Sequence, residues 1–144
     1  MTLEQLARTD VVTADTEATL TEIARIMTDE GVGSVVVVEP DGRPCGLVTD
    51  RDLVTYGIAA GRDPDQTIAN DVMAFTMVSA EVTDGVLDVI SRMADEGVRR
   101  MPVMADGELY GIVTLDDFIV LLAGELESLA KVVEAESPPR ATGR

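Results

Sequence analysis

Gly46-Leu47-Val48-Thr49-Asp50-Arg51-Asp52-Leu53 recurs 65 residues later as Gly111-Ile112-Val113-Thr114-Leu115-Asp116-Asp117-Phe118. In both copies an apolar run leads to a Thr that is followed three residues later by Asp, a pattern typical of a strand that ends where a helix begins. The free backbone N–H groups at a helix start suit a ribose and a phosphate. We therefore expect the function to lie at these two turns.

The composition limits both the core and the chemistry. The chain has 144 residues, 46% of them apolar, but only four aromatic residues, so one substantial core must be built from aliphatic side chains. It contains a single cysteine, Cys45, and no histidine. Neither an internal disulfide, a Cys/His metal site nor a Ser/His or Cys/His nucleophile pair can therefore form. We expect no catalytic residues and no metal ligands.

The charge is strongly negative. A net charge of −16 would repel nucleic-acid phosphate and anionic membranes, so we expect neither as a partner. No apolar run approaches the roughly 18 residues of a membrane span, and Met1 to Asp10 lacks the features of a signal peptide, which predicts a cytoplasmic protein. The cations are ten Arg and one Lys, and this pattern resembles cytosolic proteins of salt-accumulating archaea. A halophilic, haloarchaeal origin is our hypothesis.

The chain contains two copies of one unit. Leu3 to Gly31 matches Ala69 to Gly97 at an offset of 66 residues, whereas the repeated turn is offset by 65 residues. The extra residue of the first copy lies between two strands, in a turn that contains Asp-Gly in both copies, a strong hairpin signal. The turn length differs while the flanking strands keep their phase.

Each copy predicts the order βαββα. A short strand at Val11–Val12 or Met77–Val78 precedes an amphipathic helix that ends at Gly31 or Gly97. Two apolar strands and a second helix follow. We expect these strands to be covered on both faces, as continuous apolar runs indicate. They are Ser34 to Val38, Gly46 to Thr49, Met101 to Met104 and Gly111 to Thr114.

A half of about 60 residues buries too little surface to be stable alone, so we predict an α/β fold in which two βαββα repeats pack sheet to sheet with pseudo-twofold symmetry. The expected organisation is a lead helix in 1–10, repeat 1 in 11–60, a linker with a second lead helix in 61–76, repeat 2 in 77–127, and a helix extension with a frayed tail in 128–144.

These features together resemble a tandem pair of cystathionine-beta-synthase (CBS) domains, a Bateman module, from Val11 to about Gly124. The resemblance rests on the repeated Gly-apolar-apolar-Thr-x-x-Asp turn, the repeated helix-Gly-strand join, and Arg99-Arg100-Met101-Pro102-Val103. It implies a stand-alone regulatory protein without catalysis. Its two clefts would accept AMP, ADP, ATP or S-adenosylmethionine, and occupancy would be passed to an unidentified protein partner.

The resemblance also implies site residues. For ribose and phosphate it nominates Thr49, Asp52, Thr114 and Asp117, and a carboxylate can indeed accept both hydroxyls of a cis-diol. For adenine it nominates Thr13, Ala14, Asp15, Ser79, Ala80, Glu81, Met101 and Pro102. The cations nearest the turns, Arg51, Arg99 and Arg100, are candidates for phosphate contact.

Each of these signals has a purely structural alternative. Thr and Asp at this spacing also form a capping box that needs no ligand. The arginines could form surface ion pairs, and because strand residues alternate, Arg99 and Arg100 cannot both face one cleft without a bulge. Asp116 beside Asp117 disfavours a polyphosphate in the second cleft unless Mg²⁺ accompanies it.

The segment from Asp116 to about Glu136 predicts a helix with apolar residues spaced alternately three and four apart. They are Ile119, Leu122, Leu126, Leu129 and Val133. This short coiled-coil pattern predicts a homodimer, and packing of the helix against its own domain is the alternative. Two rival functions remain open: a ligand-free dimeric scaffold, and a nucleotide-acting enzyme that relies on a metal held by Asp52 or Asp117.

Overall fold

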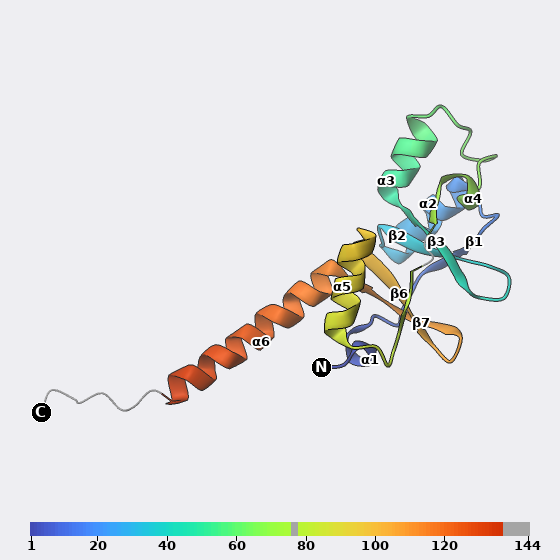
Figure 1. Cartoon of the computed structure of the whole chain (residues 1–144). Coiled ribbons are helices and arrows are strands. Elements are labelled where there is room, and N and C mark those ends of the chain that lie inside the picture. Colours follow the sequence, from blue (N-terminus) through green and yellow to red (C-terminus); the bar gives the residue numbers. More distant parts are fainter. Residues whose placement is uncertain (76–77, 137–144) are drawn as a thin grey trace, which may run out of the picture.

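The computed structural model describes residues 1–75 and 78–136. It has the predicted α/β architecture, with two small sheets and their helices arranged as two repeats (Figure 1). Repeat 1 consists of β1 (Thr13–Asp15), α2 (Leu20–Glu30), β2 (Ser34–Val38), β3 (Pro44–Thr49), α3 (Asp50–Asp52) and the π-helix η1 (Leu53–Ile58). Repeat 2 consists of β5 (Ala80–Glu81), α5 (Val86–Glu96), β6 (Arg100–Ala105), β7 (Glu108–Thr114) and α6 (Leu115–Glu136).

The first long helix of each repeat ends where the sequence predicts. Gly31 and Gly97 take the left-handed conformation, with φ of 66° and 67°, and close α2 and α5. Each helix buries a stripe at helical spacing, Ile23 and Met27 in α2 and Val89 and Met93 in α5. The predicted hairpins are also confirmed, since β2 pairs antiparallel with β3 and β6 with β7.

Two strand predictions need correction. The first strand of each repeat begins later than predicted, because β1 pairs with β2 only from Thr13 onward and Val11–Val12 is left as a connecting segment. Of the predicted Met77–Val78 strand, Met77 lies outside the described residues. Secondly, β2 and β6 have buried centres as predicted, but β3 and β7 alternate, so that Leu47 and Ile112 are only half-buried. One face of β3 and β7 therefore remains accessible.

The two segments that precede the repeats are exchanged between the cores. The N-terminal helix α1 (Leu3–Leu6) places Leu3 and Ala7 in the core of repeat 2. The linker helix α4 (Ala69–Val72) and the strand β4 (Ala74–Phe75) instead join repeat 1, where Ala69, Val72 and Met73 lie in the core and β4 pairs with β3. Each core is thus completed by the segment leading into the other repeat.

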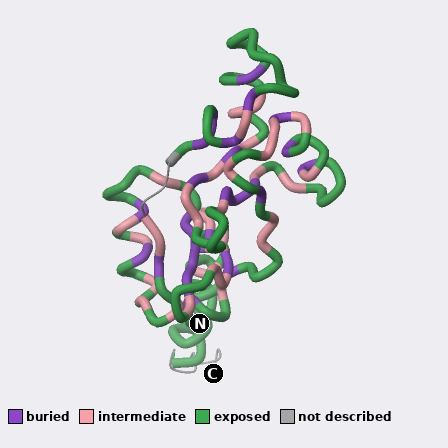
Figure 2. Tube along the Cα trace, turned by 90° about the vertical axis from the view of Figure 1, so that its right-hand side faces the viewer, coloured by how far each residue is buried: buried purple, intermediate pink, exposed green. Residues whose placement is uncertain are grey.

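Buried residues concentrate in the strands and on the inner sides of the helices, and exposed residues cover the outside (Figure 2). Helix α6 differs, because it extends away from the rest of the molecule and is exposed at every position from Leu122 to Glu136 (Figure 1). The alternative in which this helix packs against its own domain is therefore wrong beyond Leu121. Ser137 to Arg144, predicted as a tail, lie outside the described residues. Among the helices of the described residues, none combines the length and apolarity needed to cross a membrane.

Candidate ligand-binding cleft

Both repeated turns form capping boxes. The backbone N–H of Thr49 donates to Asp52 Oδ2 at 2.9 Å, and the N–H of Asp52 donates to Thr49 Oγ1 at 3.2 Å. The same two bonds measure 3.0 and 3.3 Å between Thr114 and Asp117. The capping interpretation is therefore confirmed, and it occupies one carboxylate oxygen, Oδ2, of each Asp.

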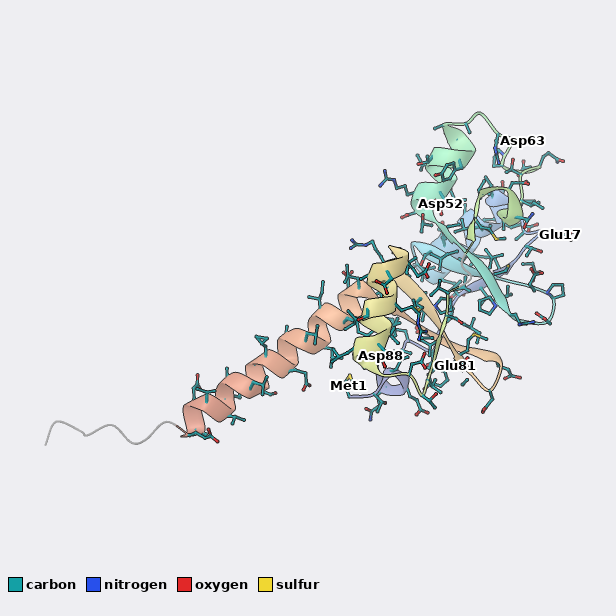
Figure 3. All side chains as sticks on the ribbon, viewed as in Figure 1. Met1, Glu17, Asp52, Asp63, Glu81 and Asp88 are labelled. Atoms are coloured by element: carbon teal, nitrogen blue, oxygen red, sulfur yellow. The ribbon has the colours of Figure 1, made fainter. Side chains whose placement is uncertain are left out.

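The start of each turn is fixed against the segment that follows the first long helix of its repeat. The N–H of Asp50 donates to the carbonyl of Gly33 at 2.9 Å, and the N–H of Leu115 donates to the carbonyl of Arg99 at 2.8 Å. These bonds hold the Thr-x-x-Asp turn beside the first residues of β2 in repeat 1 and of β6 in repeat 2. Figure 3 shows Asp52 at the start of the helix that follows β3.

The Thr114 turn opens onto a cleft of about 400 Å³ between the repeats. Repeat 1 contributes Asp10 to Val12, Gly31 to Ser34 and Val36, repeat 2 contributes Arg99, Arg100, Ile112 and Thr114 to Asp116, and Arg8 joins them from the N-terminal segment. The accessible face of β7 at Ile112 thus forms part of its wall. Accessible backbone, the hydroxyls of Ser34 and Thr114 and several cations are groups that can recognise a small anion.

Arginines gather in this cleft, since three of the ten in the chain, Arg8, Arg99 and Arg100, line it against two carboxylates, Asp10 and Asp116. Both Arg99 and Arg100 line this cleft, although strand alternation predicted that without a bulge only one of them would face it. Arg99 precedes β6, which begins at Arg100, so strand alternation does not apply to the pair.

Arg8 is a residue that sequence reasoning missed. Its Nη2 and Nε lie 3.0 and 3.3 Å from Oδ1 of Asp117, which makes an ion pair between the N-terminal segment and the Thr114 turn. Its counterpart in the duplication is Ala74, and this difference between two otherwise matched segments was the available signal. Asp117 itself is not among the residues lining the cleft.

The residues that the resemblance nominates for adenine contact do not line this cleft. Ala14, Ala80 and Met101 are buried in the two cores. Ser79, Glu81 and Pro102 line a different groove, between the hairpin turns of the two repeats, and Glu81 lies well away from Asp52 in Figure 3. Thr13 and Asp15 are exposed outside the cleft. The residues that line it on this side are Asp10 to Val12, because β1 begins only at Thr13.

The Thr49 turn differs from the Thr114 turn in the residues around it. The counterparts of Asp10 and Val11 in the duplication are Thr76 and Met77, which lie outside the described residues. Arg51 is exposed, and its N–H donates to Asp50 Oδ1 at 2.8 Å. Within residues 1–75 and 78–136, no group of three or more Cys, Asp or Glu side chains could hold a metal ion.

Comparisons with known proteins agree with the duplicated fold. Residues 3–58 and 69–124 each match the family described as the CBS domain. An uncharacterized protein of Methanopyrus kandleri is 40% identical over 116 residues, which are 80% of this chain and 59% of that protein. This chain thus spans about three fifths of that relative. The CBS domain-containing protein YhcV of Bacillus subtilis is 37% identical over 112 residues, 78% of this chain and 79% of YhcV.

Among solved structures, Hypoxic Response Protein I with two coordinated zinc ions superposes with a TM-score of 0.72 at 29% identity, over 83% of this chain and 97% of that one. Relatives occur in both archaea and bacteria. They do not test the haloarchaeal hypothesis.

Proposed function

Since this chain belongs to the CBS domain family and carries two copies of the domain in tandem, we propose that it is a regulatory module that binds an adenosine compound. The observation that carries the proposal is the cleft between the repeats, where the Thr114 turn meets Arg8, Arg99 and Arg100. Occupancy would shift the packing of the two repeats and thereby change affinity for an unidentified protein partner, with reciprocal coupling.

The size and charge of the cleft favour a small anionic nucleotide. Its volume, about 400 Å³, lies within the range of about 300–1,000 Å³ typical of ligand pockets. Arg99 and Arg100 supply positive charge, while Asp10 and Asp116 oppose the accumulation of several phosphates. AMP or another monoanionic to dianionic adenosine compound fits this balance better than ATP, which would need Mg²⁺ to offset the two carboxylates.

Two structural neighbours that share this fold were solved with adenosine compounds, and their ligands support the proposed class. A CBS domain protein from Pyrobaculum aerophilum, complexed with AMP, has a TM-score of 0.70 at 24% identity, covering 81% of this chain and 89% of that chain. The CBS domain pair of protein MJ0100, in complex with 5-methylthioadenosine and S-adenosylmethionine, has a TM-score of 0.72 at 21% identity, covering 87% and 98%.

Within this proposal Thr114 and Asp117 contact the ribose and phosphate of one ligand, with Arg99 and Arg100 at the phosphate. Thr49, Asp52 and Arg51 would form the second site by the same symmetry. Asp10, Val11 and Val12 replace the adenine nominees at the Thr114 cleft, since they line it and those nominees do not. No residue is proposed to be catalytic, and no resident metal is proposed.

A thermal-shift panel tests the proposal. The full chain is heated in molar KCl with AMP, ADP, ATP, S-adenosylmethionine or NAD, each well above an expected dissociation constant. We expect AMP or a close relative to raise the melting temperature in a concentration-dependent way. No shift with any compound would favour the ligand-free scaffold, and metal-dependent turnover of ATP would favour the enzyme.

The protruding part of α6 supports homodimerisation as a further role. Its apolar seam consists of Ile119, Leu122, Leu126, Leu129 and Val133, whose exposed fractions run from 43 to 67%. The positions flanking this seam are Ala123, Ala130, Val132 and only one charged residue, Glu125. A second copy could therefore cover the seam without placing many like charges together, and we propose that the protein dimerises through α6.

A further inference from the structure

Arg8 combines an anchored backbone with an exposed side chain that bonds to Asp117. The N–H of Arg8 donates to the carbonyl of Ile112 at 2.9 Å, and the N–H of Ile112 donates to the carbonyl of Arg8 at 2.9 Å. The Arg8 side chain is nevertheless 66% exposed, whereas that of Asp117 is 10% exposed. The guanidinium can therefore swing on an anchored Cα while the carboxylate stays in place.

The Asp117 carboxylate is nearly saturated by the protein itself. A carboxylate offers about four acceptor positions. Three donors already use them, the N–H of Thr114 on Oδ2 and the Nε and Nη2 of Arg8 on Oδ1. A ribose cis-diol that donates both hydroxyls needs two positions, so Arg8 must release at least one bond when such a ligand binds.

The released guanidinium would remain in the cleft, because Arg8 lines it together with Arg99 and Arg100. A ligand phosphate in the cleft would contact Arg8 in addition to Arg99 and Arg100. This new contact would compensate for the lost ion pair between Arg8 and Asp117. A nucleoside without a phosphate offers no such compensation. The Thr49 turn has no equivalent device, since Ala74 stands at the position of Arg8, and among the described residues Asp52 has no cationic partner.

We propose that Arg8 is a specificity-determining latch, which holds Asp117 in the empty cleft and transfers to the ligand phosphate when a nucleotide binds. This inference rests on the proposed adenosine site and adds the ligand class to it: the latch selects phosphate-bearing compounds over nucleosides. Every ligand that binds Asp117 must break at least one Arg8–Asp117 bond. Only a ligand with a phosphate gains a contact with the released guanidinium in return.

The test is calorimetric titration of the full chain with AMP and with adenosine, using wild type, Arg8→Ala, Arg8→Lys and Arg25→Ala. Arg25, on α2 and outside the cleft, controls for the loss of one positive charge. We expect Arg8→Ala to weaken AMP binding about tenfold or more. We expect adenosine to bind this variant up to about fivefold more tightly than wild type. Arg8→Lys should recover part of the AMP preference, and Arg25→Ala should match wild type.

The possible results distinguish a failure of the latch from a failure of the proposed adenosine site. If wild type binds AMP but Arg8→Ala leaves the ratio of AMP to adenosine affinity unchanged, the latch is refuted and the adenosine site stands. If adenosine binding weakens as much as AMP binding, Arg8 only supports the shape of the turn, and selectivity is refuted. If wild type binds neither compound, the latch is refuted, and the proposed function fails too if no other compound of the thermal-shift panel binds.

Discussion

Gly111 lies so close to Arg8 that a Cβ atom added to it would be 2.5 Å from the Arg8 carbonyl oxygen and 3.2 Å from the Ala7 Cβ. At this contact the N-terminal segment bridges to β7. The equivalent contact in the other half is the close approach of Gly46 on β3 to Met73 and Ala74. The glycines of the repeated turn pattern therefore serve the exchange of segments between the two cores.

Gly111→Ala should destabilise the fold by about 1–3 kcal/mol, because a backbone carbonyl cannot move aside without breaking the bridge. Gly46→Ala should cost less, since the closest atom there is the flexible Met73 Sδ, at 2.5 Å from the added Cβ. Gly124→Ala, in α6 with nothing near its added Cβ, is the control and should not destabilise. Urea unfolding measures all three, and equal costs at Gly111 and Gly124 would contradict the exchanged arrangement.

Cys45 should react slowly with alkylating reagents near neutral pH. Burial raises the pKa of its thiol, and the negative charge of Glu39 and a hydrogen bond with it raise the pKa further. Because the thiolate is the nucleophile, the rate of iodoacetamide labelling should still be rising above pH 9. Glu39→Gln should lower the pKa and accelerate labelling at pH 8.5, whereas Asp41→Asn in the same turn should not. Equal rates in wild type and Glu39→Gln would refute this assignment.

Dimerisation through α6 should be sensitive to charge on its apolar seam. Leu126→Glu places a carboxylate at the centre of the seam, so we expect the mass measured by light scattering in molar KCl to fall from dimer to monomer. Ser128→Glu, on the same helix but off the seam, should remain dimeric. Residues 122–136 are exposed, so neither change should perturb the core. A monomeric mass for the wild-type protein would contradict the proposed dimer.

High salt should stabilise the protein. Its charge of −16 is self-repelling, and the Debye length shortens from about 10 Å at 0.1 M to about 3 Å at 1 M salt. We therefore expect the melting temperature to rise steadily between dilute buffer and molar KCl. A melting temperature that is indifferent to KCl would contradict the halophilic hypothesis.

The repeated pattern was enough to predict the fold class, the hairpins and the helix ends at Gly31 and Gly97, because periodicity and left-handed glycines are local signals. It could not predict that each lead segment joins the opposite repeat. That choice depends on long-range packing, as between Leu3 and the core of repeat 2. The late start of β1 was missed for the same reason, since Val11 and Val12 are as apolar as a strand although the register with β2 begins only at Thr13. The Val12 carbonyl accepts the N–H of Val36 at 3.0 Å just before that register begins.

The candidate site was predictable only in part. Thr114 and Asp117 follow from the repeated turn, and both arginines at the start of β6 line the cleft. The Arg8 contact joins residues 109 positions apart, so no local pattern indicates it, and the one sequence signal was that Arg8 stands where the second copy has Ala74. The adenine nominees came from the family resemblance, and in repeat 1 the residues that line the cleft, Asp10 to Val12, lie immediately before the nominated Thr13 to Asp15.

The central claim is that the Thr114 cleft binds an adenosine compound, and calorimetric titration of the stabilising compound into wild type, Asp117→Ala, Asp52→Ala and Asp84→Ala tests it most directly. Asp84 is a matched control outside the cleft, because it too accepts a backbone N–H three residues earlier, that of Glu81, and pairs with an arginine, Arg92. We predict saturable binding at this cleft that is lost in Asp117→Ala and kept in Asp84→Ala. Undiminished binding in an Asp52→Ala/Asp117→Ala double variant, or none in wild type, would contradict the account.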